Sequence, residues 1–203
     1  MNTNGHSFFS LAFRMKNIRR WGLMRSTRPE NLTEHCAETA IIAHAIAIIG
    51  NKYFGKSYDA EHIMCLAMFH DLCEVYTGDM PTPVKYFNED MRESYKAIEA
   101  ASAQKLLSKL PDEMRSEYSA LVEQDCVATK KDAEMHAIVK AADKLSALIK
   151  CVEERKAGNT EFISAERSTR ASIEKMGIPE ADYFMKHFMP AFELDLDELG
   201  IGG

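Results

Sequence analysis

Three polar side chains interrupt the most apolar stretch of the sequence. His70 and Asp71 directly follow the run Ile63–Phe69, and Glu74 lies one helical turn after His70 on the same face of a predicted helix. Burial of an unpaired charge costs several kcal/mol, so these groups must pair with other side chains or bind a metal ion. A single histidine in a helix is more often an ordinary core or surface residue, so partners elsewhere in the chain decide the interpretation.

Two such partners lie on other predicted helices. His35 is near the start of a helix predicted over 31–50, which opens with a capping-box pattern. Asp143 lies beside the apolar stripe of a long helix predicted over about 132–156. An isolated aspartate in a helix is usually solvated. Four such groups on three helices that must pack together indicate a shared polar site.

The rest of the pattern is helical as well. Alanine occurs 24 times and valine 6 times, and no alternating apolar stretch is bounded by turn residues. The helix that carries His70 is predicted to begin after Asp59, to be the most buried element, and to stop near Tyr76, before a segment rich in glycine and proline. Further helices are predicted over 8–18, 89–109 and 112–124, followed by two short ones before 188 that separate near Gly177. The sequence therefore predicts an all-α fold, with residues 1–203 as a single domain.

Composition is typical of a folded globular protein. Of the 203 residues, 46% are hydrophobic and 28% are charged, and no run of about 18 apolar residues could span a bilayer. The cysteines form no CxxC pair, which favours free buried thiols in a reducing compartment over a disulfide framework or a zinc ribbon. We therefore expect a cytoplasmic protein without a membrane partner. The five cysteines are Cys36, Cys65, Cys73, Cys126 and Cys151.

Positive charge is concentrated near the N-terminus. Residues 1–29 contain no acidic residue, whereas the whole chain has a net charge of −6. A solvated basic helix face, a transit peptide and a nucleic-acid-binding arm would each give this pattern. The pI of about 5.7 and the lack of an aromatic ladder argue against extended nucleic-acid binding, so a small phosphorylated ligand fits better. The basic residues are Arg14, Lys16, Arg19, Arg20, Arg25 and Arg28.

The order of these candidates along the chain is that of a known signature. His35, then His70-Asp71, then Asp143 resembles the H…HD…D pattern of the HD-domain phosphohydrolases, an all-helical, metal-dependent superfamily. Further motifs narrow the resemblance to the bacterial YfbR-like 5′-deoxynucleotidase family, and the likeness covers nearly the whole chain. These motifs are Arg20-Trp21, the sequence ENLTEH over 30–35, TGDMPTPVKY over 77–86 and DYFM over 182–185.

The resemblance implies one divalent metal ion, held by His35, His70, Asp71 and Asp143. Two imidazoles and two carboxylates leave positions open on an octahedral ion such as Co, Mn or Cu for water and a phosphate oxygen. No thiolate is placed to join them, which disfavours structural zinc. His136 lies about two turns before Asp143, roughly 10 Å along the helix, and is too far away to share the ion.

The resemblance also implies roles around the metal. Glu74 is expected to act in proton transfer and Arg20 to hold the phosphate, which makes these two the catalytic candidates. Trp21 is expected near the sugar. Two alternatives stay open, with Trp21 as an ordinary core aromatic and the loop over 79–82 as a plain connector. The substrate-binding set is Arg20, Trp21, His35, Asp71, Asp79, Met80, Pro81, Thr82 and Asp143.

These expectations combine into one functional hypothesis. The chain is predicted to be an all-α HD-domain phosphohydrolase that removes the 5′-phosphate of deoxyribonucleoside 5′-monophosphates, giving deoxynucleoside and orthophosphate. A homodimer is implied by the resemblance alone. Two alternatives remain: an HD phosphohydrolase that acts on a nucleoside triphosphate or an alarmone, and a nucleotide sensor with a vestigial metal site.

Overall fold

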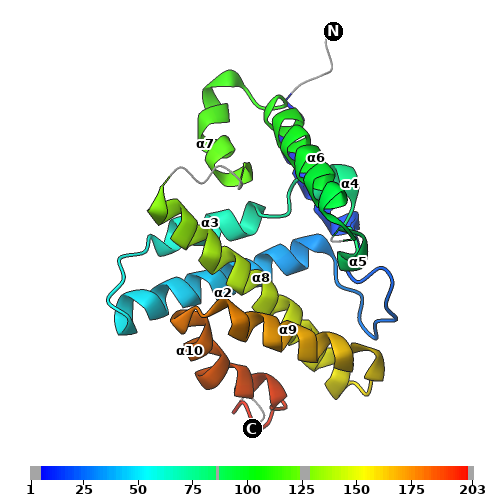
Figure 1. Ribbon diagram of the computed structural model, residues 1–203, viewed down its shortest axis with the longest axis vertical. Coiled ribbons are helices and arrows are strands. Elements are labelled where there is room, and N and C mark those ends of the chain that lie inside the picture. The colour runs from blue at the N-terminus through cyan, green and yellow to red at the C-terminus, as the bar shows by residue number, and fades with distance from the viewer. Residues whose placement is uncertain (1–5, 86, 124–128, 201–203) are drawn as a thin grey trace.

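The regular structure is entirely helical. The computed structural model describes residues 6–85, 87–123 and 129–200, and no strand occurs among them (Figure 1). The expectation of an all-α fold is therefore confirmed. The helices are α1 (Phe8–Ala12), η1 (Phe13–Asn17), α2 (Leu32–Tyr53), α3 (Ala60–Phe69), α4 (Glu74–Thr77), α5 (Thr82–Lys85), α6 (Glu89–Leu107), α7 (Asp112–Val122), α8 (Lys130–Lys156), η2 (Thr160–Phe162), α9 (Ile163–Met176), α10 (Pro179–His187) and η3 (Met189–Glu193), where η marks a 3₁₀ helix.

The centre of the molecule is the crossing of α2 with α3 and α8. In Figure 1, α8 runs across α2, with α6 and α7 at one end of the molecule and α9 and α10 at the other. Small buried residues on α2, such as Ala43 and Ala47, allow close contact between the helices. Ile46, Leu145 and Leu148 complete this core and are fully buried. Core packing therefore fixes the two long helices that carry His35 and Asp143.

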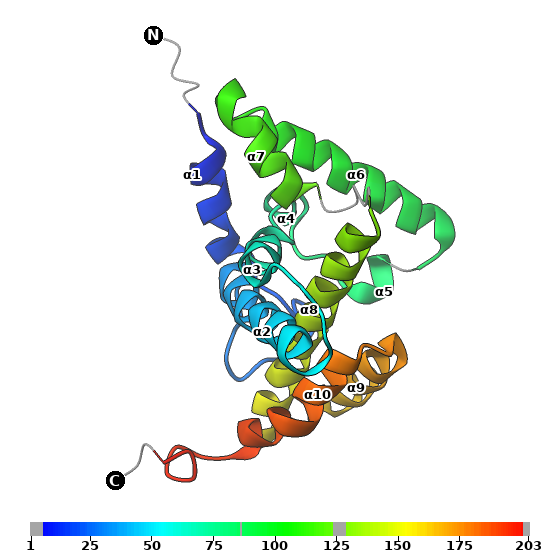
Figure 2. The same ribbon diagram turned by 90° about the vertical axis from the view of Figure 1, so that its left-hand side faces the viewer.

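A second core joins the N-terminus to α6. Phe8, Leu32, Leu72 and Leu106 are all fully buried in it, and Figure 2 shows α1 at the same end of the molecule as α6 and α7, the upper end in that view. The helix predicted over 8–18 is half α-helix and half 3₁₀ helix, because η1 continues from α1 with a tighter turn.

Helix α2 begins as the sequence predicts and ends later. The Asn31 side chain accepts hydrogen bonds from the amides of Thr33 and Glu34, while the Glu34 side chain accepts from the Asn31 amide, which is a complete capping box. The predicted end at Gly50 is wrong, since the helix continues to Tyr53. Gly50 is instead a point of close approach, because a Cβ there would lie 2.6 Å from the ring of Tyr58.

The prediction of one continuous helix to Tyr76, which would be the most buried element, is wrong. Helix α3 ends at Phe69, residues 70–73 form a turn, and α4 begins at Glu74. The cause is local: Nδ1 of His70 contacts the Ala67 carbonyl at 2.6 Å, and the Asp71 amide would use that carbonyl in a continuous helix. Helix α3 is also covered on one side only, which leaves Met64 and Met68 more than a third exposed.

The later helices follow their predicted bounds closely. Helices α6, α7 and α8 start and end within about two residues of the expected positions. The break between α9 and α10 lies at Gly177, which is left-handed with φ 60°, and Pro179 is the first residue of α10. That residues 1–203 form a single domain stays a prediction.

The cysteines and α2 bear on the predicted compartment. Among the described cysteines, Cys36 and Cys151 are buried, Cys73 is half-buried and Cys65 is exposed, so the expectation of buried thiols is wrong for Cys65; Cys126 lies outside the described residues. Within the described part of the chain, α2 is the one helix long and apolar enough to cross a membrane by length and composition. It packs between α3 and α8, with 56% of its most apolar window buried, as core helices do.

Candidate metal centre and substrate cavity

The four predicted metal ligands come together where α2, the end of α3 and α8 meet. Ligand atoms of His35, His70 and Asp71 all lie within 4.8 Å of one another. Asp143 Oδ1 is 3.1 Å from His35 Nε2 and 4.0 Å from His70 Nε2. Asp71 Oδ2 is 3.2 Å from His70 Nε2 and 3.8 Å from His35 Nε2. Two imidazole nitrogens and two carboxylates therefore face a common point.

Both imidazoles present Nε2 to this point because their other nitrogen is engaged. His70 Nδ1 contacts the Ala67 carbonyl, which only accepts, so Nδ1 carries the proton. His35 Nδ1 is 3.2 Å from Ser146 Oγ, and Ser146 donates in turn to Glu38. Within the described residues, Nε2 of each histidine is buried without a hydrogen-bond partner. Bare, buried nitrogens beside two carboxylates suit a divalent cation, so the residues fit the implied metal.

The electrostatics keep the two aspartates ionised. Burial favours the neutral form of Asp71, but the charges of His70, His35 and Arg20 together outweigh it and hold the pKa of Asp71 well below its usual range. Burial also opposes ionisation of Asp143, yet the neighbouring His35 lowers the pKa of Asp143 to about 2. Both carboxylates are therefore available as anionic ligands at neutral pH.

Glu74 differs from the two aspartates in its protonation state. It is the first residue of α4 and is almost fully buried, and its Oε2 has no hydrogen-bond partner among the residues described. Burial, together with the negative charges of Asp71 and Asp79, raises the pKa of Glu74 to about 9. The side chain next to the metal cluster is therefore a protonated carboxyl group at neutral pH.

Arg20 is the basic residue of the N-terminal segment that reaches the cluster. Its Nη1 is 3.4 Å from Asp71 Oδ2 and 3.9 Å from Asp79 Oδ1, and its side chain is only 13% exposed. By contrast, the side chains of Arg25 and Arg28 are 96% and 75% exposed. The basic segment therefore contains one guanidinium in the site and other cations in solvent.

The irregular segment over 18–31 that carries Arg20 and Trp21 is held at both ends. At its base, Arg19 and Asn31 form an isolated β-bridge, and the Arg20 amide donates to the Glu30 carbonyl at 3.0 Å. Further out, the Glu154 carboxylate on α8 accepts from the amide and the hydroxyl of Thr27, both at 2.8 Å. These polar contacts fix a segment that has no helix of its own.

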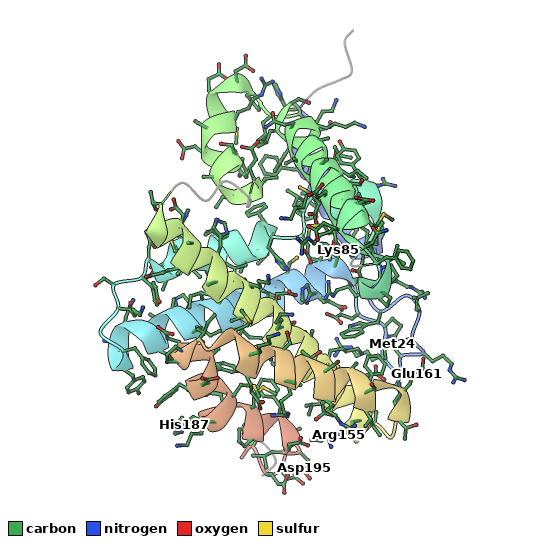
Figure 3. The ribbon with its side chains drawn as sticks, in the orientation of Figure 1. Met24, Lys85, Arg155, Glu161, His187 and Asp195 are labelled. Atoms are coloured by element: carbon green, nitrogen blue, oxygen red, sulfur yellow. The ribbon has the colours of Figure 1, made fainter. Side chains whose placement is uncertain are left out.

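A cavity of about 660 Å³ opens beside the cluster. Its walls come from the segment that carries Arg20, from the loop that precedes α5, and from helices α8 and α9. Figure 3 shows two of the lining residues, Met24 and Glu161, close together at the right of the view, with Lys85 of α5 above them. The Trp21 ring packs against Phe162 at 5.2 Å between ring centroids, so Trp21 is both a packing residue and a wall of the cavity. Six predicted site residues line the cavity: Arg20, Trp21, Asp79, Met80, Pro81 and Asp143.

The other predicted residues lie behind this cavity or at its edge. His35 is fully buried, and Asp71 contacts Arg20, so both reach the cavity through their neighbours. Thr82 is the first residue of α5, and its side chain lies outside the described residues. The loop over 79–81 is more than a connector, because its residues form part of the wall.

Sequence reasoning missed one acidic residue at the centre of the site. Glu30 is only 7% exposed, and its Oε2 accepts from Trp21 Nε1 at 2.6 Å. Contacts with His35, Arg20 and Trp21 lower the pKa of Glu30 despite its burial. Its position directly before the helix cap marked it as part of a motif, but nothing in the pattern indicated that its side chain turns inward.

Comparison with known proteins identifies the family. A family model described as 5′-deoxynucleotidase YfbR-like matches residues 7–192. The chain belongs to this family. It is 47% identical to a 5′-deoxynucleotidase of Vibrio atlanticus over 192 residues, 95% of this chain and 97% of that protein. It is 46% identical to the 5′-deoxynucleotidase YfbR of Escherichia coli, covering 95% and 94% of the two chains.

Solved structures of HD-domain phosphohydrolases share the fold of this YfbR-like chain. An HD-domain phosphohydrolase from Listeria innocua superposes with a TM-score of 0.77 at 24% identity, covering 97% of this chain and 91% of that one. The HD phosphohydrolase DatZ of cyanophage S-2L, solved with dA and one catalytic Zn²⁺ ion, has a TM-score of 0.63 at 17% identity, with coverages of 87% and 93%. The fold is therefore that of the HD-domain phosphohydrolases, as expected.

Proposed function

We propose that this protein is a metal-dependent 5′-deoxynucleotidase, which hydrolyses deoxyribonucleoside 5′-monophosphates to deoxynucleoside and orthophosphate. The observation that carries the proposal is the cluster of two histidines and two aspartates beside Arg20 and the protonated Glu74, at one end of a cavity of about 660 Å³. A cavity of this size accommodates a small ligand such as a nucleoside monophosphate. Membership of a family of 5′-deoxynucleotidases supports the substrate class.

His35, His70, Asp71 and Asp143 would hold one divalent ion. When bound, such an ion acidifies water and neutralises negative charge on a phosphoryl group. The proposal of a single ion is supported by the four-residue cluster and by the one catalytic Zn²⁺ ion of the cyanophage protein. Co, Mn, Cu and Zn are the candidates for this site.

Arg20 would bind the phosphate. Its guanidinium lies at the junction of the metal cluster and the cavity, and a planar fork of donors matches two phosphate oxygens. Its Nη1 lies near Asp71 and Asp79. These two carboxylates would hold the Arg20 guanidinium at the edge of the cavity, where the phosphate would bind.

Glu74 would supply the proton that the leaving group needs. In the hydrolysis, phosphorus gains a bond to a water oxygen and loses its bond to the 5′ oxygen of the sugar, and that oxygen must be protonated. In the metal-free chain, the buried Glu74 carboxyl group has a pKa of about 9 and holds a proton at neutral pH. An acid whose pKa is near the working pH is suited to this transfer.

The sugar would lie between Trp21 and the loop over 79–82. Trp21 and Asp79 line the same cavity from opposite segments. Asp79 would accept a hydrogen bond from a sugar hydroxyl, and Met80, Pro81 and Thr82 would border the sugar with the apolar ring of Trp21. A 2′-hydroxyl that faced the apolar ring of Trp21 would find no polar partner there, which favours the deoxy sugar.

A phosphate-release assay tests the proposal directly. With a panel of divalent ions, dAMP should release orthophosphate at least ten times faster than AMP at limiting substrate. Faster hydrolysis of dATP or of an alarmone would favour the polyphosphate alternative. Tight binding of dAMP without phosphate release, under every metal, would favour the sensor alternative.

A homodimer and a cytoplasmic location remain proposals that rest on the resemblance and on cysteine usage. Light scattering of the purified protein at micromolar concentration measures the oligomeric state. A mass of about 46 kDa would support the dimer, since one chain has a mass of 22.9 kDa.

A further inference from the structure

Glu30 contacts three residues of the proposed site with one side chain. Its Oε2 accepts the indole hydrogen of Trp21 at 2.6 Å. Its Oε1 lies 3.4 Å from His35 Nδ1 and 3.6 Å from Arg20 Nε. The carboxylate is therefore placed between a metal-ligand candidate and the two residues proposed to hold phosphate and sugar.

The backbone fixes this placement. The Glu30 carbonyl accepts from the Arg20 amide, and the next residue, Asn31, caps α2 and pairs with Arg19. The carboxylate is thus anchored at the point where the irregular segment meets the first turn of α2, which carries His35. Little motion is available to it, because the residue is 7% exposed.

The conformation of Trp21 shows that this part of the chain is under restraint. Trp21 has φ 59°, and it is the one non-glycine residue with positive φ in the part of the chain that the structure describes. A bulky side chain occupies that region only where its surroundings hold it. The hydrogen bond to Glu30 and the packing on Phe162 are two such restraints.

We propose that Glu30 is a positioning residue that couples the metal centre to the substrate-binding segment. Its carboxylate keeps the proton on His35 Nδ1, so that Nε2 faces the metal, and it orients Arg20 and Trp21 toward the cavity. An acidic partner on the outer nitrogen of a metal-binding histidine raises the basicity of the ligand and fixes its ring. The part of the proposal that concerns substrate rests on the proposed function, and the part that concerns metal does not.

Ser146 is the competing partner of His35. Its hydroxyl lies 3.2 Å from His35 Nδ1, slightly closer than Glu30 does, and it donates to Glu38. Ser146 has no contact with Trp21 or Arg20 among those found in the described residues. A Ser146 variant therefore tests support of the His35 imidazole alone. A Glu30 variant also tests the coupling between the metal centre and the substrate-binding segment.

The test compares Glu30→Gln with Glu34→Gln as the matched control. Both changes replace a carboxylate by an amide, and the polar contacts of the Glu34 side chain among the described residues are with the helix cap and the exposed Arg28. A glutamine at position 34 can still complete the capping box. Trp21 is the only tryptophan of the chain, so its fluorescence reports on this site without metal or substrate.

For Glu30→Gln we expect three changes. In the metal-free protein, the Trp21 emission shifts to shorter wavelength, because a negative charge beside the pyrrole nitrogen stabilises the excited indole. The Kd for Mn²⁺, measured by competition with a chelator, rises by about ten- to a hundredfold. With dAMP, kcat/KM falls at least tenfold through both a lower kcat and a higher KM. Glu34→Gln should stay within twofold of the wild type in every measurement.

Two results would overturn the proposal. One is a Glu30→Gln variant whose Mn²⁺ affinity and kcat/KM both stay within twofold of the wild type. The other is a Ser146→Ala variant that weakens Mn²⁺ binding tenfold or more while Glu30→Gln does not.

Glu30→Asp is the second variant, for the case that Glu30→Gln does not fold. It keeps the charge but withdraws it by one methylene group, so it should weaken Mn²⁺ binding and shift the Trp21 emission, both by smaller amounts than those expected for Glu30→Gln. Wild-type values of both quantities in Glu30→Asp would again overturn the proposal. If the wild type does not hydrolyse dAMP, the proposed function fails, whereas Mn²⁺ affinity and fluorescence still decide the coupling.

Discussion

Two different kinds of segment build the site. His35 and Asp143 lie on α2 and α8, which are 22 and 27 residues long and packed through fully buried side chains such as Ile46 and Leu145. Arg20, Trp21 and Asp79 lie on segments without helical structure, which are held by buried carboxylates and main-chain hydrogen bonds. The apolar core thus positions candidate metal ligands, and a polar network positions candidate substrate-binding residues.

This difference separates the consequences of substitution. Residues on the helices face a cluster that is complete before substrate arrives, so their loss should affect metal binding. Arg20, Trp21 and Asp79 on the irregular segments line the cavity, so their loss should affect substrate binding and selectivity while the metal stays. Glu30, which contacts both His35 and this segment, is the exception. His70, Asp71 and Glu74 lie between these classes, at the turn that ends α3 and at the start of α4.

The largest effect is expected for the metal ligands. His35→Ala or Asp143→Ala should remove most of the metal and nearly all phosphate release, because each deletes a donor that no other residue replaces. Metal content by elemental analysis and phosphate release from dAMP measure both effects. Chelation of the wild type should also lower its Tm, since an ion bound only by the native state stabilises it.

His136→Ala is the control for these variants. His136 lies on the same helix as Asp143, about two turns earlier, so it should keep full metal content and activity. Two ions per chain in the wild type, or full metal occupancy in Asp143→Ala, would contradict a single-ion site built from these residues.

The second-largest effect is expected for Glu74→Gln. The amide cannot donate the proton that the carboxyl group holds, so kcat should fall by about 10²- to 10⁴-fold. The metal should stay bound, because Glu74 is not one of the four ligands, and dAMP and AMP should be slowed alike. Loss of metal from this variant would instead make Glu74 a ligand.

The sequence predicted much of the helical scaffold and which residues gather at the site. Helix caps and apolar stripes depend on neighbours within a few residues, so the start of α2 and the bounds of α6 to α8 could be inferred. The break after Phe69 could not, because it depends on the imidazole of His70 taking a carbonyl from the backbone. The spacing of apolar residues carries no information about this competing hydrogen bond, so it predicts a continuous helix.

Glu30 shows the same limit within the site. Its neighbours Asn31 and Glu34 form the capping box within four residues, and this was predicted correctly. The Glu30 side chain instead contacts residues 20, 21 and 35, and residues 20 and 21 come near it only because the irregular segment folds back on α2. The resemblance gave the composition of the site, including Arg20 and Trp21. It could not show that a fifth carboxylate joins them, because only the three-dimensional arrangement brings it inside.

The third prediction tests the irregular segment through its phosphate contact. Arg20→Ala should raise KM and lower kcat together, because a charged hydrogen bond acts on both the ground state and the transition state. A loss of about 1.5 to 3 kcal/mol corresponds to roughly a ten- to hundredfold fall in kcat/KM. Arg20→Lys should recover only part, because an ammonium lacks the planar fork. Wild-type kinetics in Arg20→Ala would place the guanidinium outside the reaction.

The fourth prediction concerns sugar selection by Trp21. The wild type should prefer dAMP to AMP by roughly ten- to a hundredfold in kcat/KM, since a 2′-hydroxyl would lose a hydrogen bond to water without gaining a partner, at a cost of about 1 to 3 kcal/mol. Trp21→Ala should narrow this ratio several-fold by admitting water beside the hydroxyl. Glu74→Gln serves as the comparison, because it should keep the deoxy preference. An unchanged ratio in Trp21→Ala would move sugar selection to other residues of the cavity.

The smallest effect is a pH dependence of stability that comes from Glu74. Its pKa is raised from an ordinary value of 4.5 to about 9 in the folded chain, so the folded state keeps a proton that the unfolded state has already lost above pH 4.5. A group whose pKa is raised on folding stabilises the protein fully below its unfolded pKa, and that contribution is lost as pH rises toward the folded value. In the metal-free protein, stability should therefore decline between about pH 4.5 and 9.

Glu74→Gln removes this titration, so the metal-free variant should melt higher than the wild type at pH 8 and lose that advantage as the pH is lowered to 4.5. Each tenfold change in proton affinity is worth about 1.4 kcal/mol, and 1 kcal/mol shifts the Tm of a chain of this size by about 2–4 °C, so a difference of roughly 10 °C or more is expected at pH 8. Glu117→Gln, at an exposed position of α7, is the matched control and should follow the wild type at both pH values. Parallel Tm curves for Glu74→Gln and the wild type would mean that Glu74 is ionised in the folded chain, and its proposed role as the proton donor would then fall as well.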